Sequence, residues 1–139
     1  MVTHDQVIFT LMKAFPELTH GVDYWVGQEM DGNTQLADAK IYHWMKADVE
    51  QPTEAWIKKR VKADSKEYST SLLNGVERAW RDGELARADK ELLKAEDGDG
   101  VGEPSQWRLY RKDLRAYPDT EGFPNKPENR PVAPDSGVE

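Results

Sequence analysis

The stretch QWRLYRKDLRAYPDTEGFP, residues 106–124, decides how the second half of this chain is organised. Trp107, Tyr110 and Leu114 follow one another at spacings of three and four, so they lie on one side of a helix. The helix leads directly into a proline-punctuated segment that begins at Tyr117. We therefore expect an amphipathic helix over residues 106–116, packed through its aromatic side on the helices that precede it.

The composition changes from Tyr117 onward. Proline fixes the backbone angle φ and has no N–H to donate, so this tail cannot be an α-helix or a central strand. We expect an extended tail over residues 117–139, poor in internal hydrogen bonds, in which Phe123 is the adaptable contact to a partner. Five of the eight prolines lie in the tail: Pro118, Pro124, Pro127, Pro131 and Pro134.

Helical patterns fill the region between residues 52 and 94. Thr53 is a good N-cap for a helix, and Glu54 is favourable in its first turn. The pattern weakens over residues 62–67, where a break can fall, and a further helix is expected over Asp82–Lys94. One apolar stripe is expected to reach Trp80, formed by Ile57, Val61, Tyr68, Leu72, Val76 and Ala79.

The first 50 residues predict a short helix followed by a β-hairpin. Thr3 can cap the helix, with Gln6 as its capping-box partner, and Pro16 ends the apolar repeat. Val22–Val26 alternates like a strand, and Asp31-Gly32 is a turn signal. Residues 38–45 are expected to return as the second strand, with a helical turn as the alternative.

The fold class predicted from these patterns is mainly α with a small β-hairpin (α+β), with a helical C-terminal half followed by an extended proline-rich tail. We expect a small N-terminal α+β unit over residues 1–50. A helical region over residues 51–116 and the tail over residues 117–139 complete the predicted organisation.

The composition limits the function classes. The chain has 139 residues, of which 37% are hydrophobic and 32% are charged, so we expect a small core and a large solvated surface. The net charge of −7 argues against a nucleic-acid binder, which neutralises phosphates. The absence of cysteine fits a reducing cytosol, and no apolar run reaches the length of a membrane span. No secretory signal is recognised at the N-terminus.

No catalytic or metal-binding pattern is recognised. The loop DGDGVGE, residues 97–103, resembles a calcium loop, but Val101 and Arg108 stand where two of the ligands are needed. His4, His20 and His43 lie in three different predicted elements and do not converge as a zinc site requires. We therefore expect no enzyme, no cofactor and no metal site.

The predicted C-terminal helix also carries a basic stripe. If this stripe is solvated or paired with the acidic loop over residues 96–103, it has a structural role only. If it is free, it can bind an acidic partner or nucleic acid, although an acidic chain disfavours the latter. The stripe consists of Arg108, Arg111, Lys112 and Arg115.

Several motifs recur through the C-terminal half: R-D-x-x-L at Arg81, Asp82 and Leu85, then Asp89, then W-x-x-Y-R-x-x-L-R-x-x-P over Trp107–Pro118, and G-F-P at Gly122–Pro124. Together they resemble the bacteriophage tail assembly chaperone family over roughly residues 81–134. The N-terminal half is similar to another phage tail-region pattern, seen in Asp23-Tyr24, the Asp31-Gly32 turn, Ile41-x-x-Trp44 and Pro52-Thr53-Glu54.

The resemblance implies a non-enzymatic tail or tail-fibre assembly protein whose partner is a tail-fibre or baseplate subunit. Self-association is a further expected contact, whereas nucleic acid and membrane are not expected partners. Such a protein acts in the host cytoplasm during assembly, or in the virion tail if it is retained. The expected partner-binding residues are Trp107, Tyr110, Arg111, Leu114, Arg115, Tyr117, Pro118, Phe123 and Pro124.

Two alternatives remain open from the sequence. The protein can be a structural tail, baseplate or fibre subunit retained in the virion, in which case the same surfaces are permanent interfaces. It can also be a host-directed binding module that acts through the basic stripe.

Overall fold

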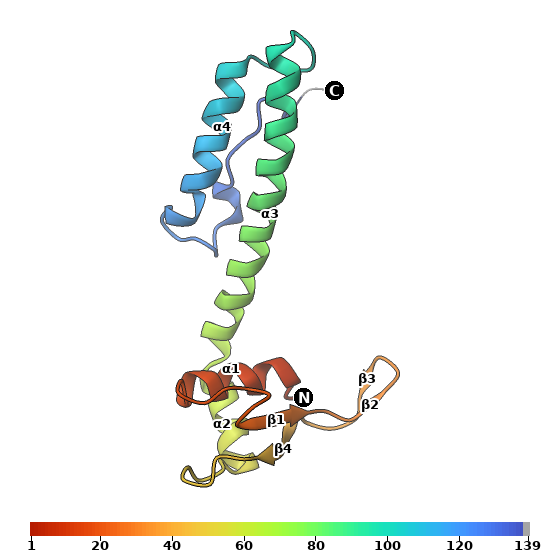
Figure 1. Cartoon of the computed structure of the whole chain (residues 1–139), viewed down its shortest axis with the longest axis vertical. Helices are drawn as coiled ribbons and strands as arrows, with labels where there is room; N and C mark the ends of the chain where they lie inside the picture. The colour runs from red at the N-terminus through yellow and green to blue at the C-terminus, as the bar shows by residue number, and fades with distance from the viewer. Residues whose placement is uncertain (138–139) are drawn as a thin grey trace. The chain divides into compact units, whose positions relative to one another are not determined.

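The computed structural model describes residues 1–137 and divides into two compact units, Met1–Ser69 and Thr70–Glu139 (Figure 1). Each unit has its own buried apolar cluster. The described residues form four α-helices and a small antiparallel sheet, which confirms the expected α+β class. The boundary between the units falls inside the helical region expected over residues 51–116, and the three-part division of the chain stays a prediction.

The first unit begins with α1, His4–Ala14. Thr3 caps this helix because its hydroxyl accepts a hydrogen bond from the Gln6 N–H, while the Gln6 side chain accepts one from the Thr3 N–H. The predicted capping box is thus confirmed. Val7 and Leu11, one turn apart, are fully buried and face the core of the unit.

The predicted β-hairpin is present. Strand β1, Tyr24–Gly27, pairs antiparallel with β4, Lys40–Trp44, so that Tyr24 lies opposite Trp44. Residues 38–45 therefore return as a strand. Two shorter strands, β2 (Met30–Asp31) and β3 (Thr34–Gln35), pair around the predicted Asp31-Gly32 turn, where Gly32 has a φ of +58°.

Helix α2, Glu54–Ala63, completes the first unit together with the start of α3, Ser65–Glu96. Thr53 caps α2 as predicted, since its hydroxyl accepts a hydrogen bond from the Trp56 N–H. The two helices meet at Asp64, inside the stretch where the sequence allowed a break. The Asp64 carboxylate is buried and accepts hydrogen bonds from Thr10 and Lys13. Burial raises the pKa of Asp64, but these two bonds outweigh it and hold the pKa below its ordinary value.

Helix α3 is continuous from Ser65 to Glu96, so the separate helix predicted to start at Asp82 is wrong. Residues 81 and 82 include no proline, and Gly75 and Gly83 cost a helix only about 1 kcal/mol each. Packing of the following helix on Ala88, Leu92 and other α3 residues outweighs that cost.

The apolar stripe predicted for the core is only partly buried. Ile57 and Val61 belong to the core of the first unit, but Leu72 and Val76 are 53% and 58% exposed. In their place α3 buries Glu77, which is only 3% exposed. The stripe therefore does not continue into the core at Leu72 and Val76. Spacing could not indicate the burial of Glu77, because the groups that donate hydrogen bonds to it come from distant parts of the chain.

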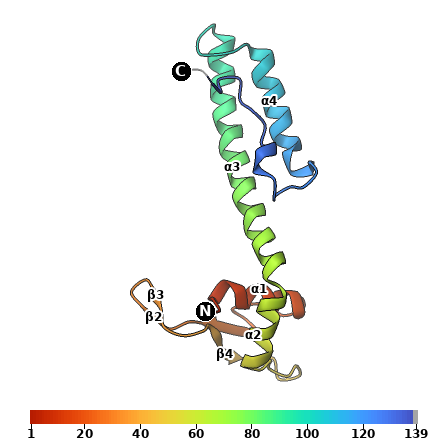
Figure 2. The ribbon, with the colours of Figure 1, turned by 180° about the vertical axis from the view of Figure 1, so that it is seen from behind.

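The second unit pairs α3 with α4, Pro104–Ala116, which lies beside α3 in both views (Figures 1 and 2). Pro104 stands in the first turn of α4, where its missing N–H costs nothing. Glu103 and Gln106 form a capping box. Ala88, Leu92 and Ala95 of α3 form one buried cluster with aromatic residues of α4.

The tail returns along the second unit instead of extending away from it. Among its described residues it contains neither α-helix nor strand, as expected, but it includes two 3₁₀ turns, η1 (Tyr117–Asp119) and η2 (Pro127–Asn129). Backbone hydrogen bonds close further turns, for example from the Asn125 N–H to the Gly122 oxygen at 2.8 Å. The expectation of few internal hydrogen bonds is therefore wrong, because Pro118, Pro124, Pro127 and Pro134 lie within turns, which tolerate a residue without an N–H.

Within residues 1–137, none of the helices combines the length and apolarity that crossing a membrane requires.

Candidate functional site

The family-like residues of α4 form the core of the second unit. Trp107, Tyr110 and Leu114 lie on the side of α4 that faces α3 and are at most 3% exposed. The Trp107 indole N–H donates a hydrogen bond of 2.8 Å to the Val101 carbonyl oxygen, which anchors the preceding loop. The spacing of these residues therefore serves first to hold the two helices together.

A network of charged groups borders this core. The Tyr110 hydroxyl donates a 2.6 Å hydrogen bond to Glu84, and Arg87 donates to both Glu84 and Asp135. The Arg87 guanidinium also lies 5.6 Å from the centre of the Trp107 ring. Burial and the Glu84 bond raise the pKa of Tyr110 well above its ordinary value, so the phenol stays protonated. Asp135 attaches the far end of the tail to α3 through this network.

A second attachment joins the middle of the tail to Glu77. The Glu77 carboxylate accepts hydrogen bonds from Nε and Nη2 of Arg130. It also accepts a 2.7 Å hydrogen bond from the Tyr117 hydroxyl. The Arg130 guanidinium also lies 4.5 Å from the Trp80 ring centre. The Arg130 bond, together with the Tyr117 bond, outweighs burial and lowers the pKa of Glu77, so this buried carboxylate is ionised. The charge is compensated only because the tail is folded.

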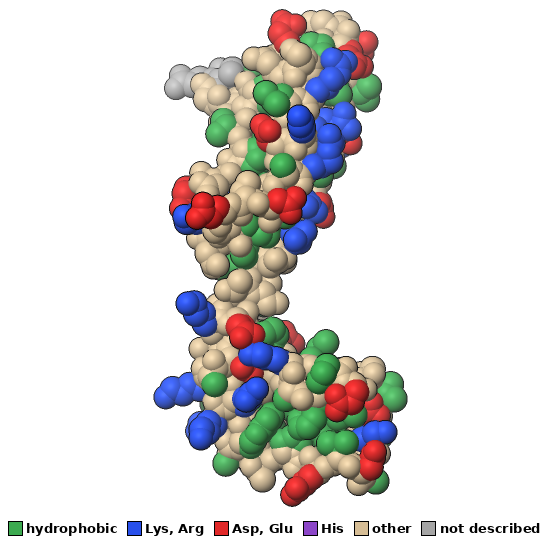
Figure 3. All heavy atoms as spheres, turned by 90° about the vertical axis from the view of Figure 1, so that its left-hand side faces the viewer, with side chains coloured by type: hydrophobic (Ala, Val, Ile, Leu, Met, Phe, Trp, Pro, Cys, Tyr) green, Lys and Arg blue, Asp and Glu red, His purple; other side chains and the backbone are tan. Residues whose placement is uncertain are grey.

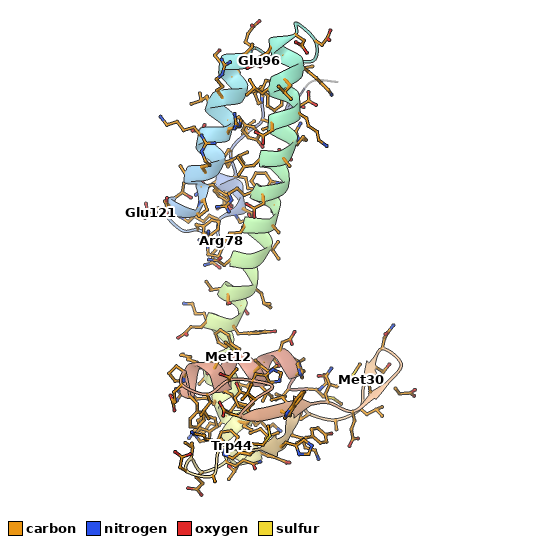
Figure 4. The ribbon with its side chains drawn as sticks, in the orientation of Figure 1. Met12, Met30, Trp44, Arg78, Glu96 and Glu121 are labelled. Carbon is orange, nitrogen blue, oxygen red and sulfur yellow. The ribbon has the colours of Figure 1, made fainter. Side chains whose placement is uncertain are left out.

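Phe123 also packs inside the unit. Its ring meets the Tyr117 ring edge to face at 5.0 Å, and the Arg78 guanidinium lies 5.6 Å from it. Figure 4 shows Arg78 on α3 close to the turn that follows α4, on which Glu121 lies. The next residue, Pro124, is buried behind a cis peptide bond. Phe123 therefore has contacts within the unit, to Tyr117 and Arg78, that an extended tail would not provide, and its role in partner binding stays a prediction.

The basic stripe lies on a flank of α4, about a third of a turn from its buried side. Arg108 is paired with Glu96, and Arg111 with Asp89, each at 2.8 Å. No carboxylate of the described residues lies within 4 Å of the Lys112 or Arg115 charged groups. Figure 3 shows Lys and Arg side chains gathered along one side of this unit. Two of the four basic residues, Arg108 and Arg111, therefore have the ion-pair role that one interpretation of the sequence gave to the whole stripe. Lys112 and Arg115 have no such partner among the described residues.

An apolar hollow lies between α4 and the last part of the tail. Its volume is about 210 Å³. Leu109 on α4 is 58% exposed, and Val132 on the tail is 77% exposed. Sequence reasoning missed both residues, although a leucine between Arg108 and Tyr110 is off the aromatic side of the helix and could have been noticed. The lining residues are Gln106, Leu109, Tyr110, Asp113, Val132 and Pro134.

The structure sorts the predicted partner-binding residues by exposure. Arg111, Pro118 and Phe123 are half-buried, and Arg115 is exposed. The partner-binding role of the whole set stays a prediction, and its exposed or half-buried members are the ones that a partner can reach in the folded unit. The buried members are Trp107, Tyr110, Leu114, Tyr117 and Pro124.

The acidic loop after α3 turns sharply. Gly98, Gly100 and Gly102 all have φ between +77° and +86°, a conformation that other residues rarely adopt. Within the described part of the chain, no three His, Asp or Glu side chains converge in a way that could hold a metal ion.

Comparison with known protein families agrees with the two units. Residues 7–69, nearly all of the first unit, match the family described as XkdW protein. Residues 75–135, nearly all of the second unit, match the family described as phage tail assembly chaperone protein. No curated protein and no solved structure matches the chain.

The two helices with their returning tail are the part of the chain that matches this family, and the match supports a role in phage tail assembly. Residues 75–135 are thus similar to the phage tail assembly chaperone family, which confirms the resemblance seen in the C-terminal motifs.

Proposed function

We propose that this protein is a non-enzymatic tail assembly chaperone that binds a tail-fibre or baseplate subunit through the outer face of α4 and the tail beside it. The observation that carries this proposal is the pair of exposed apolar residues, Leu109 and Val132, that line a hollow between α4 and the tail. The similarity of residues 75–135 to the family supports a role in tail assembly.

The surface is well suited to a reversible contact. Burying an exposed leucine or valine in an interface stabilises it by roughly 1.5–3 kcal/mol. Lys112 and Arg115, which have no carboxylate within 4 Å in the described residues, can steer and orient an acidic edge of the partner. The Glu77 and Arg87 networks hold the tail in place, so little entropy is lost when the partner binds.

Co-expression with the neighbouring tail-fibre gene tests the proposal. We expect the protein to raise the soluble, assembled fraction of the fibre, and Leu109→Glu and Val132→Glu to reduce binding by about tenfold or more. Leu36→Glu, at a residue of the first unit that is 54% exposed, is the matched control and should leave binding unchanged. Equal fibre solubility with and without the protein would rule the proposal out.

The chaperone role also predicts where the protein is found. A transient chaperone acts in the host cytoplasm and leaves before the particle is complete. Mass spectrometry of purified particles should then detect no stoichiometric amount of this chain. Stoichiometric presence would instead identify a structural subunit retained in the tail, using the same face as a permanent interface.

A further inference from the structure

A second apolar stripe runs along α3 on a side that the described residues of its unit leave exposed. Its seven positions recur in alternating steps of four and three, the repeat of a coiled-coil seam. All seven residues are exposed, and six of them are apolar. The positions are Leu72, Val76, Ala79, Gly83, Ala86, Lys90 and Leu93.

This stripe is distinct from the side of α3 that forms the core. Ala88 and Leu92 face α4, roughly opposite the stripe at 100° per residue. Leu72, Val76 and Leu93 are nevertheless 53%, 58% and 63% exposed. A helix whose outer side meets only water carries polar residues there. An apolar repeat on both sides indicates a helix that packs on both sides.

We propose that this stripe is the contact with a second copy of the chain, through a parallel pairing of two α3 helices. The stripe extends over three heptads from residue 72 to residue 93, about 32 Å at 1.5 Å per residue. Apolar heptads sustained over that length with flanking charges are typical of a coiled coil. The sequence-based expectation of self-association receives a defined surface in this way.

The charges beside the stripe select the second copy and its direction. Asp82 and Asp89 lie on one flank, and Arg87 and Lys94 lie on the other, each base five residues after an acid. In a parallel pair this spacing brings the acid of one copy to the base of the other. In an antiparallel pair, acids would face acids and bases would face bases. The pattern is therefore self-complementary for the parallel arrangement only.

Two such pairs can form between the copies, Asp82 with Arg87 and Asp89 with Lys94. The Asp89–Lys94 pair has side chains that are more accessible to a second copy. Their side chains are 59% and 58% exposed, although Arg111 and Glu91 already contact them within the chain. Arg87 is committed to Glu84 and Asp135 and adds less. A symmetric dimer makes the Asp89–Lys94 contact twice.

The centre of the stripe favours a close but weak seam. Gly83 lies between Ala79 and Ala86 in the stripe, and apart from the adjacent residues and nearby backbone of α3 itself, no described atom lies within 4 Å of where a Cβ at Gly83 would be. The two helices can therefore approach closely there. Lys90 would face its own counterpart, which costs stability but sets the register.

The chain contains no cysteine, so single cysteines report the geometry directly. In a parallel seam each stripe residue faces itself, and Leu72→Cys and Leu93→Cys should each form disulfide-linked dimers under mild oxidation. Lys112→Cys, exposed on α4, is the control and should form few. Linkage only in a mixture of Leu72→Cys with Leu93→Cys would show an antiparallel pair, and no linkage above the control would show no pair. Either result would overturn the proposal.

Sedimentation of the full chain provides an independent measurement. We expect a concentration-dependent species of twice the 15.9 kDa chain mass. Val76→Glu, at an exposed residue, should weaken the dimer at least about tenfold, and Lys90→Leu should tighten it. Leu36→Glu should leave it unchanged. A wild-type chain that remains at the monomer mass over the whole soluble range would contradict the proposed contact.

Discussion

Arg130 donates two hydrogen bonds to Glu77, a residue 53 positions earlier in the chain. The pair joins the proline-rich tail to α3 and leaves the glutamate only 3% exposed. Because a buried charge is tolerated only when it is paired and hydrogen-bonded, this contact makes the tail a part of the folded second unit.

Removal of Arg130 should destabilise the second unit. Arg130→Leu leaves the Glu77 charge without its main partner, and we expect a loss of about 2–3 kcal/mol, reduced from the fully buried case because Arg130 is partly exposed. Urea unfolding followed by circular dichroism measures it. Arg115→Leu, at an exposed residue, is the control and should change stability by less than about 0.5 kcal/mol. Equal stability of the two variants would mean that the pair contributes nothing.

Stability should fall as the solution becomes acidic. Hydrogen bonds from Arg130 and Tyr117 lower the pKa of Glu77 in the folded state. A lowered carboxyl pKa contributes stability that is complete above the ordinary glutamate value of about 4.3 and is lost as pH falls through the folded-state value. Thermal melts between pH 7 and 3 should show this loss, and it should be smaller in Glu77→Gln. An identical pH dependence in both proteins would refute the assignment.

Replacing Trp107 or Phe123 by alanine should destabilise the free protein in both cases, but by different amounts. Trp107→Ala removes the centre of the core and should cost roughly 3–5 kcal/mol. Phe123→Ala loses its edge-to-face contact with Tyr117 and part of its burial, so we expect a loss of about 1–3 kcal/mol in the free protein. Differential scanning fluorimetry of the isolated chain checks both. If Phe123→Ala melts at the wild-type temperature, the Phe123 side chain does not stabilise the free protein and is available as a partner contact.

The N-cap of α2 should matter to the first unit. Thr53→Ala removes the hydroxyl that accepts the Trp56 N–H bond, at a cost of about 1 kcal/mol. Thr53→Ser keeps the hydroxyl and should retain most of that stability. Unfolding curves that rank serine no better than alanine at this position would show that the cap is not the reason for the threonine.

The elements that sequence patterns predicted correctly are those that depend on neighbours a few residues apart. The Thr3 capping box closes within three residues, and the turn at Asp31-Gly32 needs only a glycine that accepts a positive φ. The aromatic side of α4 follows from the spacing of Trp107, Tyr110 and Leu114. Such features can be predicted because the interacting groups are close in the chain whatever the rest of the fold does.

The candidate interaction surface could be predicted only in part. Lys112 and Arg115, which lack a carboxylate partner among the described residues, belong to a stripe visible in the sequence. Leu109 lies off the aromatic side of α4, so helix spacing alone could have indicated its exposure. The exposure of Val132 could not be deduced in this way, because it depends on where the tail returns.

The amino-acid order alone was sufficient for the Thr3 and Thr53 helix caps, the hairpin and the family resemblance, since all of them are local patterns. Only the tertiary structure decided which side of α3 is buried. Hydrophobicity favours Leu72 and Val76 as core and Glu77 as surface, yet the fold reverses this arrangement. The reason is that Tyr117 and Arg130, 40 and 53 residues away, return to Glu77 and satisfy its carboxylate. The energy of burying a charge depends on partners that no local pattern can reveal.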